Sequence, residues 1–239
     1  AHRGYSSEAP ENTTAAFELA VQNGFYGVEC DVRKTYDGEF VIMHDADLNR
    51  MCGYNLSLST MALQQLKQYT ITAGKNISQY PDLTIPTLDE YLQIVQTSST
   101  IHPFIELKEE FSASELKEIV SQVRNRGLLD RTYFISMYQS NLLTLKTIDD
   151  VNQEGLQYVY GAESSNKLLP VDDTVINWCI SNAIDLDTRY TLVTASDISR
   201  LHDSGRKVNV WTVNDVQKAC DLVRDANVDM ITTEYLLRS

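Results

Sequence analysis

Two histidines and three acidic residues stand where apolar strand patterns end, and they are the residues best able to do chemistry. They are His2, Glu29, Asp31, His44 and Glu106. Imidazole titrates near neutral pH, so one histidine can deprotonate an attacking oxygen while the other protonates a leaving alkoxide. Because phosphodiester cleavage needs both steps, the set indicates a metal-assisted phosphodiesterase site.

The three acidic residues have a spacing that suits a cation. Residues two apart in a strand share a face, so Glu29 and Asp31 project to one side, about 7 Å apart along the chain. Glu106 and Lys108 repeat this spacing on a later strand. Three converging carboxylates repel one another unless a cation lies among them, and oxygen ligands favour Mg²⁺ or Ca²⁺ over zinc. We expect one such cation; the alternative is a set of salt-bridged interior charges.

Further residues suit substrate binding. Arg3 and Lys108 are predicted to neutralise charge on the phosphoryl oxygens. Trp211 should face a barrel mouth, where it packs against a glycerol or alcohol moiety or, alternatively, fills the core. The other two histidines, His102 and His202, precede a strand and lie in a helical pattern, and we predict structural roles for both.

Composition limits the partners. The chain has 239 residues, 43% of them hydrophobic, which is enough for one domain over residues 1–239 with a sizeable core. Asp and Glu number 33 against 20 Lys and Arg, a formal charge of −13, so the average field repels nucleic acid and anionic membranes. We expect a small-molecule substrate, no nucleic acid, and no stable membrane insertion because no run of about 18 apolar residues exists. The oligomeric state is not predicted.

The cysteines and the first residues bear on location. Cys30, Cys52, Cys179 and Cys220 show no CxxC spacing, which predicts mostly buried thiols rather than a zinc site or a disulfide framework. The absence of a signal-peptide pattern favours a cytoplasmic protein. An upstream segment with an export signal, and hence an extracytoplasmic location, is the alternative, because the first strand lacks the apolar residues that usually precede such a motif.

Strand and helix patterns alternate along the chain, as in βα units that feed a parallel sheet. The predicted strands are residues 1–4, 27–34, 103–108, 132–137, 156–161, 183–188, 207–213 and 228–233. The predicted helices are residues 12–23, 87–97, 112–126, 139–150, 171–182, 194–204 and 215–226. Eight strands favour an α/β fold, a (β/α)8 TIM barrel with right-handed crossovers.

Two segments depart from this repeat. Only four residues separate residues 40–44 from the second strand, too few for a parallel crossover, so a hairpin should return His44 to the side of Glu29 and Asp31. Residues 46–86 are polar, with one helical stretch near residues 60–69. We predict an inserted cap there, between the hairpin and the third strand, that shapes the substrate pocket.

Short motifs run in order through nearly the whole chain. They are His2-Arg3-Gly4, Pro10-Glu11-Asn12-Thr13, Glu29-Cys30-Asp31-Val32, Asp37-Gly38, His44-Asp45 followed by Leu48 and Arg50, Ile85-Pro86-Thr87-Leu88, Glu106-Leu107-Lys108, and Trp211-Thr212-Val213-Asn214. With these motifs the chain resembles the glycerophosphodiester phosphodiesterases, which share their barrel with the phosphatidylinositol-specific phospholipases C. The resemblance implies that the two histidines are the acid and base pair, that the three acids hold the metal, and that Arg3 and Lys108 contact phosphate.

Some positions near the expected site leave alternatives open. The family's Thr-Asp followed by Pro is replaced by Thr232-Thr233-Glu234-Tyr235. Its Ser-Phe is replaced by Ser136-Met137-Tyr138, where Tyr138 takes the aromatic role with a shifted register. Asn12 either caps a helix or contacts substrate, and Glu11 either lies in the first helical turn or orients a catalytic group.

The sequence therefore predicts a hydrolase that converts glycerophosphodiesters to glycerol phosphate and an alcohol such as choline, ethanolamine or glycerol. Attack by a glycerol hydroxyl through a cyclic phosphate and direct attack by water both remain open. One alternative is a lysophospholipase D or C type phosphodiesterase, which would need an apolar groove over residues 46–86. Another is a catalytically silent barrel that binds a phosphate ligand, for which the loss of a histidine or a carboxylate is expected.

Overall fold

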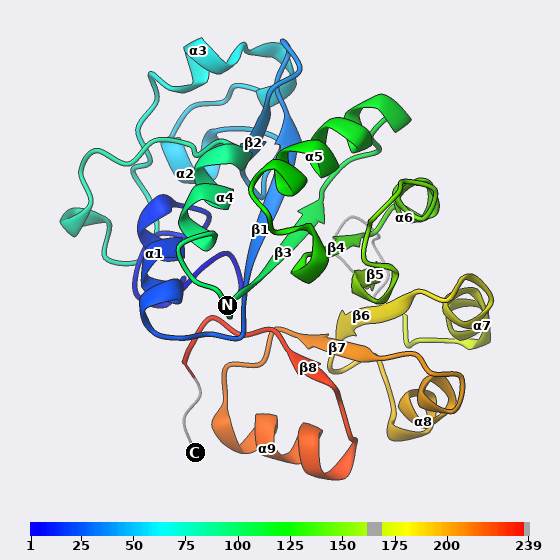
Figure 1. The fold of residues 1–239 in the computed structure, drawn as a ribbon. Helices are drawn as coiled ribbons and strands as arrows, with labels where there is room; N and C mark the ends of the chain where they lie inside the picture. The colour runs from blue at the N-terminus through cyan, green and yellow to red at the C-terminus, as the bar shows by residue number, and fades with distance from the viewer. Residues whose placement is uncertain (162–168, 237–239) are drawn as a thin grey trace.

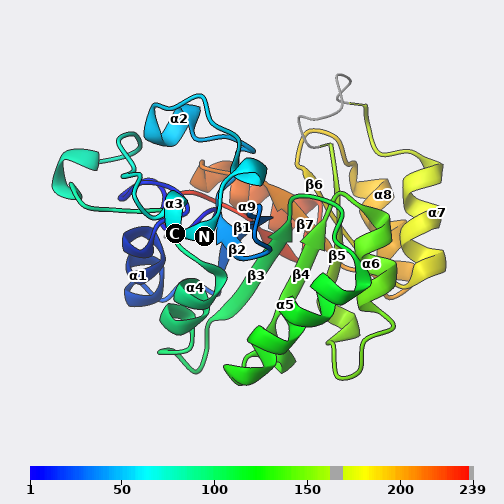
Figure 2. The same cartoon turned by 90° about the horizontal axis from the view of Figure 1, so that it is seen from above.

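The structure, a computed structural model, describes residues 1–161 and 169–236 and consists of a curled sheet surrounded by helices (Figure 1). The strand order is β2-β1-β3-β4-β5-β6-β7-β8. Strands β1 and β2 are antiparallel. Every other neighbouring pair in this order is parallel. Helices α5 to α8 lie outside strands β3 to β7, as the view from above in Figure 2 shows. This is the arrangement of the predicted α/β barrel.

The element bounds follow the predicted alternation, with ends that differ by a few residues. The strands are β1 Gly27–Lys34, β2 Phe40–Ile42, β3 His102–Leu107, β4 Tyr133–Ser136, β5 Leu156–Tyr160, β6 Asp185–Arg189, β7 Val208–Trp211 and β8 Met230–Ile231. The helices are α1 Thr14–Gln22, α2 Asn49–Cys52, α3 Leu63–Leu66, α4 Leu88–Val95, α5 Ala113–Asn125, α6 Gln139–Leu145, α7 Asp173–Asn182, α8 Ala195–Asp203 and α9 Val216–Asp225. No helix in the described ranges is long and apolar enough to cross a bilayer.

The predicted strand at residues 1–4 is wrong as a regular strand. Arg3 and Gly4 have φ values of 55° and 80°, in the left-handed region that extended backbone never visits. At Gly4 an added Cβ would lie 2.7 Å from the backbone of Ala16, so only glycine fits between this segment and α1. The sequence pattern predicted the position of the segment but not its turn.

The same segment nevertheless joins the two ends of the curled sheet. The Glu29 N–H donates to the Ala1 carbonyl at 2.8 Å, and the Gly4 N–H donates to the Glu29 carbonyl at 3.2 Å. On the other side the His2 N–H donates to the Thr233 carbonyl at 2.7 Å. Residues 1–4 therefore lie between β1 and the end of β8, in the place of an eighth barrel strand.

The predicted hairpin is present. Val32 pairs with Ile42 and Lys34 with Phe40 in antiparallel register. Beyond the end of β2, the Met43 N–H donates to the carbonyl of Asp31 at 2.9 Å. This contact brings the chain back to β1 immediately before His44.

The inserted segment, residues 46–86, differs from its predicted single helical stretch. It contains two short helices, α2 and α3, and 3₁₀ turns at Leu58–Thr60 and Ile77–Gln79. Its apolar side chains form a buried cluster with two residues from the β2 region: Val41, Met43, Leu48, Met51, Cys52, Leu58, Met61, Leu66, Ile71 and Ile85. The segment thus has a small core of its own, packed beside the hairpin.

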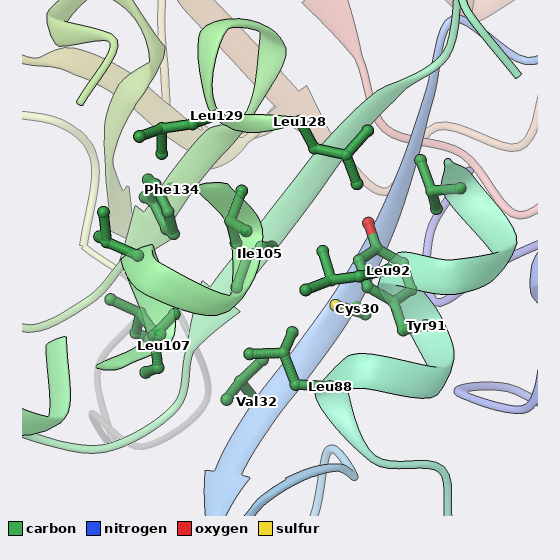
Figure 3. Close-up of a cluster of buried hydrophobic side chains, with 14 of the residues drawn as sticks. Cys30, Val32, Leu88, Tyr91, Leu92, Ile105, Leu107, Leu128, Leu129 and Phe134 are labelled. Carbon is green, nitrogen blue, oxygen red and sulfur yellow. The ribbon is translucent and has the colours of Figure 1, made fainter. Parts of the chain in front are cut away.

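The main core lies between the outer face of the sheet and the helices (Figure 3). Cys30 and Val32 on β1 point outward, toward Leu88 and Leu92 of α4, as the alternation of β1 predicts. The hydroxyl of Tyr91 donates to the Val28 carbonyl at 2.7 Å and ties α4 to β1. Because these apolar residues face outward, their alternating neighbours face the barrel interior.

Candidate active site

The three predicted carboxylates converge inside the barrel. Glu29 and Asp31 extend from β1, and Glu106 extends from β3, where its backbone pairs in register with Asp31. Ligand oxygens of the three residues lie within 4.8 Å of one another. Glu29 and Asp31 are buried, with exposed fractions of 6% and 1%. Such a cluster of buried oxygens is the kind of site that Mg²⁺ or Ca²⁺ occupies.

Asp31 is held by the most partners. Its Oδ2 accepts a hydrogen bond from Asn12 Nδ2 at 2.7 Å and lies 3.3 Å from Arg3 Nε. Its Oδ1 lies 3.4 Å from Lys108 Nζ. Burial by itself would raise the pKa of Asp31, but Lys108, Arg3 and the other positive neighbours lower it well below the usual range. Asp31 is therefore ionised.

Glu29 and Glu106 behave differently. Burial, followed by the charges of Asp31 and Glu106, raises the pKa of Glu29 well above 4.5. Burial also raises the pKa of Glu106, although Lys108 donates to its Oε1 at 2.9 Å and opposes the shift. Glu29 Oε1 and Asp31 Oδ1 are buried without a hydrogen-bond partner. Buried oxygens that accept no hydrogen bond fit a bound cation, whose positive charge would offset the repulsion among the three carboxylates.

His44 is oriented by its neighbour in the sequence. Its Nδ1 lies 2.8 Å from Asp45 Oδ1, and its carbonyl accepts two hydrogen bonds from the Arg33 guanidinium, at 2.9 and 2.6 Å. When Nδ1–H donates to Asp45, Nε2 is the unprotonated nitrogen of the neutral ring and its lone pair is free to accept a proton. Burial lowers the pKa of His44, so the neutral ring is favoured.

His2 has a similar arrangement on the other side of Arg3. Its Nδ1 lies 3.6 Å from Glu234 Oε1, and Ser6 Oγ donates to its carbonyl at 2.9 Å. Burial is the largest cause of a lowered pKa for His2, with Glu234 acting in the opposite direction. Each histidine therefore has a carboxylate near Nδ1.

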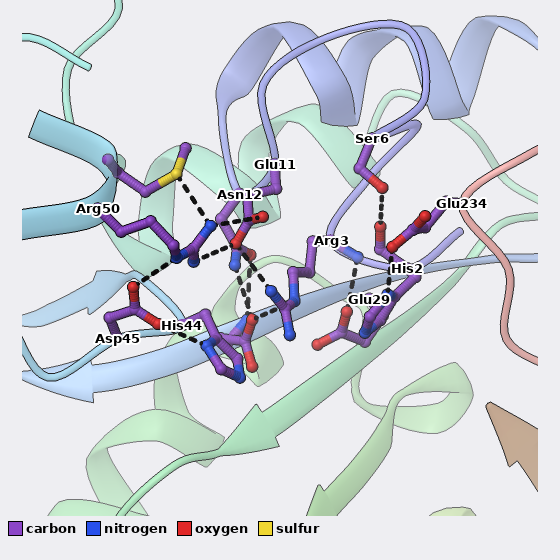
Figure 4. A network of polar contacts seen from close by, with 12 residues as sticks. His2, Arg3, Ser6, Glu11, Asn12, Glu29, His44, Asp45, Arg50 and Glu234 are labelled. Atoms are coloured by element: carbon purple, nitrogen blue, oxygen red, sulfur yellow. Dashed lines mark hydrogen bonds and ion pairs between the residues drawn. The ribbon is translucent and has the colours of Figure 1, made fainter. Parts of the chain in front are cut away.

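A chain of ion pairs links the inserted segment to the site (Figure 4). Arg50 on α2 donates to Asp45 Oδ2 at 2.7 Å and to Glu11 through both terminal nitrogens, at 3.0 and 2.7 Å. Glu11 in turn accepts a hydrogen bond from Arg3 at 2.8 Å. The carboxylate beside His44 and the guanidinium of Arg3 are thereby fixed through one arginine.

These groups surround a pocket of about 730 Å³. Of the ten residues predicted for the site, all except Asp31 and Glu11 line it. Asp31 lies beneath the pocket, and Glu11 lies behind Arg3. Trp211 is half-buried at the wall, with the Arg189 guanidinium 4.8 Å from its ring centroid, and Tyr138 precedes α6 at the rim.

The remaining predictions on polar residues have mixed outcomes. Asn12 neither caps α1 nor lines the pocket; Thr13 is the cap, and Asn12 takes a φ of 55° with its side chain on Asp31. His102 Nδ1 donates to the Arg131 carbonyl at 3.0 Å, and His202 Nε2 lies 2.8 Å from Asp229 Oδ2. Neither histidine lines the pocket.

Several pocket residues were not selected from the sequence. Asp45 and Arg50 stood inside a motif with His44, and their spacing carried the signal. Asp187 and Arg189 belong to an alternating Asp-Leu-Asp-Thr-Arg strand that repeats the spacing of Glu29 and Asp31. Glu234 had no local signal, because its place beside His2 depends on contact between opposite ends of the sequence.

Comparison with known proteins gives consistent results. Residues 2–237 match the model of the "Glycerophosphoryl diester phosphodiesterase family". A glycerophosphodiester phosphodiesterase of Bacillus altitudinis is 26% identical over 240 residues, which cover 98% of this chain and 93% of that protein. A putative glycerophosphoryl diester phosphodiesterase of Silicibacter pomeroyi has a similar fold, with a TM-score of 0.83 at 20% identity over 98% of this chain and 88% of that one.

A second solved structure includes a ligand. It is a phosphodiesterase of Oleispira antarctica in complex with the product sn-glycerol-3-phosphate. Its TM-score is 0.81 at 25% identity, over 98% of this chain and 92% of that one. Both structures share the barrel.

Proposed function

The chain belongs to the glycerophosphoryl diester phosphodiesterase family, a family of hydrolases, and we propose that it hydrolyses glycerophosphodiesters to glycerol phosphate and an alcohol. The reaction is metal-dependent, with His2 and His44 as the acid and base pair. One observation carries this proposal: two histidines, each with a carboxylate near Nδ1, share a pocket with a buried acidic cluster in which two oxygens accept no hydrogen bond. Glycerol 3-phosphate, the product in the Oleispira antarctica complex, is the product we propose here.

Glu29, Asp31 and Glu106 would hold one divalent cation, Mg²⁺ or Ca²⁺. When bound, the cation supplies positive charge to a phosphoryl oxygen and lowers the cost of the charge that gathers in the transition state. Asp31 is ionised already, whereas burial raises the pKa of Glu29, so the Glu29 carboxyl would lose a proton on binding the cation.

Arg3 and Lys108 bind the phosphate. Lys108 is buried, yet Asp31 and Glu106 outweigh the effect of burial and raise its pKa, so the ammonium stays charged at neutral pH. The Arg3 guanidinium is held by Glu11, which positions it without removing its charge. Two fixed cations inside a chain of net charge −13 give the local attraction that an anionic diester requires.

The histidines move the protons. Hydrogen bonding of Nδ1 to a carboxylate stabilises one tautomer and leaves Nε2 to accept a proton from the attacking hydroxyl or to return one to the leaving oxygen. Asp45 makes this hydrogen bond to His44, whereas Glu234 lies 3.6 Å from His2 Nδ1 and acts on that ring through its charge. Trp211 and Tyr138 line the wall that receives the organic part of the substrate.

The test is turnover of glycerophosphocholine with Mg²⁺ or Ca²⁺, measured as released choline and glycerol phosphate. His2→Ala and His44→Ala should each lower kcat by about a hundredfold or more, within the range of lost acid or base catalysis. His202→Ala, on α8 outside the pocket, is the matched control and should keep wild-type turnover. Near wild-type activity of either pocket variant, or full activity after chelation and dialysis, would overturn the proposal.

A further inference from the structure

Asp187 on β6 is a buried acid that lines the pocket and has no polar partner among the described residues. Asp185, Asp187 and Arg189 turn to the inside of the barrel, because alternate residues of a strand share a face. Asp185 accepts a hydrogen bond from the Lys207 N–H at 2.9 Å, and Arg189 donates to the Gly161 carbonyl at 3.1 Å. Within residues 1–161 and 169–236, Asp187 makes no hydrogen bond or ion pair, although only 3% of it is exposed.

The polar side chains nearest to Asp187 in the sheet are hydrogen-bonded to one another and not to Asp187. Its backbone pairs in register with Asn209 on β7 and with Val159 on β5. Asn209 Nδ2 donates to Gln157 Oε1 at 3.3 Å, and Thr232 Oγ1 donates to Asn209 Oδ1 at 3.2 Å. A buried polar group left out of such a network costs free energy, so its partner is expected from the pocket that it lines.

The place of Asp187 suits the organic part of the substrate rather than the phosphate. Strands β3, β4 and β5 lie between β1 and β6 in the sheet. In a closed barrel of eight strands this separation places β6 across the barrel from Glu29 on β1. Lys108, which follows β3, lines the same pocket of about 730 Å³. A pocket of this size holds more than a phosphate group.

The chemistry of Asp187 matches a hydroxyl group. Burial, followed by the charge of Glu106, raises the pKa of Asp187 well above its ordinary value. A neutral carboxyl both donates and accepts a hydrogen bond, as a hydroxyl does. A quaternary ammonium offers no hydrogen to bond, so it is a poorer match.

We propose that Asp187 is a specificity-determining residue that hydrogen-bonds a hydroxyl group on the organic part of the glycerophosphodiester. This inference rests on the proposed function, since it assumes that such diesters are substrates. The hydroxyl belongs either to the glycerol moiety or to the leaving alcohol, and the choice of substrates separates the two sources.

The experiment compares kcat/KM for three diesters. Glycerophosphocholine has hydroxyls on the glycerol only, glycerophosphoglycerol has them at both ends, and bis(p-nitrophenyl) phosphate has none. Asp187→Ala should lower kcat/KM for the hydroxylated substrates by about tenfold to a hundredfold, the effect of one lost buried hydrogen bond, and leave bis(p-nitrophenyl) phosphate unchanged. Asp187→Asn keeps a donor and an acceptor in place and should lose less than Asp187→Ala.

The outcomes distinguish the two proposals. A loss on both glycerophosphodiesters supports binding of the glycerol hydroxyl, and a loss on glycerophosphoglycerol alone supports binding of the leaving alcohol. Equal losses on all three diesters, or none, would overturn the role of Asp187. A wild-type protein that turns over no glycerophosphodiester refutes the proposed function instead.

Two controls keep this test decisive. Asp185→Asn, two residues away on the same strand and outside the pocket, should leave all three values unchanged, because the amide oxygen still accepts from the Lys207 N–H. If Asp187→Ala does not fold, Asp187→Leu fills the volume with apolar atoms and takes its place. The expected pattern of losses is the same.

Discussion

Replacing Glu29 by glutamine should stabilise the metal-free protein, and the gain should grow as pH rises. Because the pKa of Glu29 is raised above 4.5 by burial and by the neighbouring carboxylates, the folded protein holds this proton more tightly than the unfolded chain. Its contribution to stability is therefore fully present below pH 4.5 and is lost as pH rises through the folded-state pKa. Glutamine carries no charge at any pH and avoids the loss.

The magnitude follows from the spacing of the carboxylates. Their oxygens lie within 4.8 Å of one another, and two unit charges at about this distance repel by about 3 kcal/mol at an effective dielectric constant of 20. A cation, or the Gln substitution, that relieves one such repulsion should raise Tm by roughly 6–12 °C in a domain of this size. In the Glu29→Gln variant the cation should raise Tm by much less, about 2 °C or below, because one negatively charged ligand has been removed.

Thermal unfolding followed by circular dichroism at pH 5.5 and pH 8, with chelator or with Mg²⁺ or Ca²⁺, measures both effects. The lowered pKa values of His2 and His44 make stability rise with pH near 6.5, so the relevant quantity is the Tm difference between variant and wild type. Glu18→Gln, on the exposed face of α1, is the control and should show no such difference. A difference that does not increase from pH 5.5 to pH 8, or a variant that responds to the cation as wild type does, refutes the reasoning.

Three further substitutions test other contacts. Asp45→Asn should lower kcat by about 10- to 100-fold with KM little changed, since it removes the carboxylate that orients His44; an unchanged kcat would contradict this role. Lys108→Met should lower kcat/KM by about a hundredfold or more through the loss of a charge beside the phosphate, while calorimetry should still detect cation binding; unaltered turnover would count against it. Gly4→Ala should cost about 2 kcal/mol in urea unfolding, because of its positive φ and the contact with α1; wild-type stability would exclude that strain.

Local pattern predicted the regular part of the barrel and the convergence of the three carboxylates. Glu29 and Asp31 alternate with the apolar Cys30 and Val32, so the face of each residue follows from the two-residue period of a strand. The hairpin followed from chain length alone, because four residues cannot make a parallel crossover. The position of His44 depended on both inferences.

The remainder depends on contacts between distant parts of the sequence. The turn at residues 1–4 arises because Gly4 packs against α1. The periodicity of apolar residues along the sequence carries no information about this contact. Asn12 does not cap α1 as predicted, because its side-chain amide donates to Asp31 instead. Asp187 had the right alternation, but only the folded barrel reveals that it alone on its strand face lacks a partner within the described residues.

The segment of residues 1–4 carries a consequence for biosynthesis. His2 and Arg3 are synthesised before every other part of the site, yet the backbone of His2 is held by Thr233, which follows β8. A nascent chain that ends before residue 228 contains every predicted metal ligand and both histidines, but it lacks the strand edge that holds His2. The proposed activity should therefore appear only after residues 228–234 have been synthesised and have packed against residues 1–4.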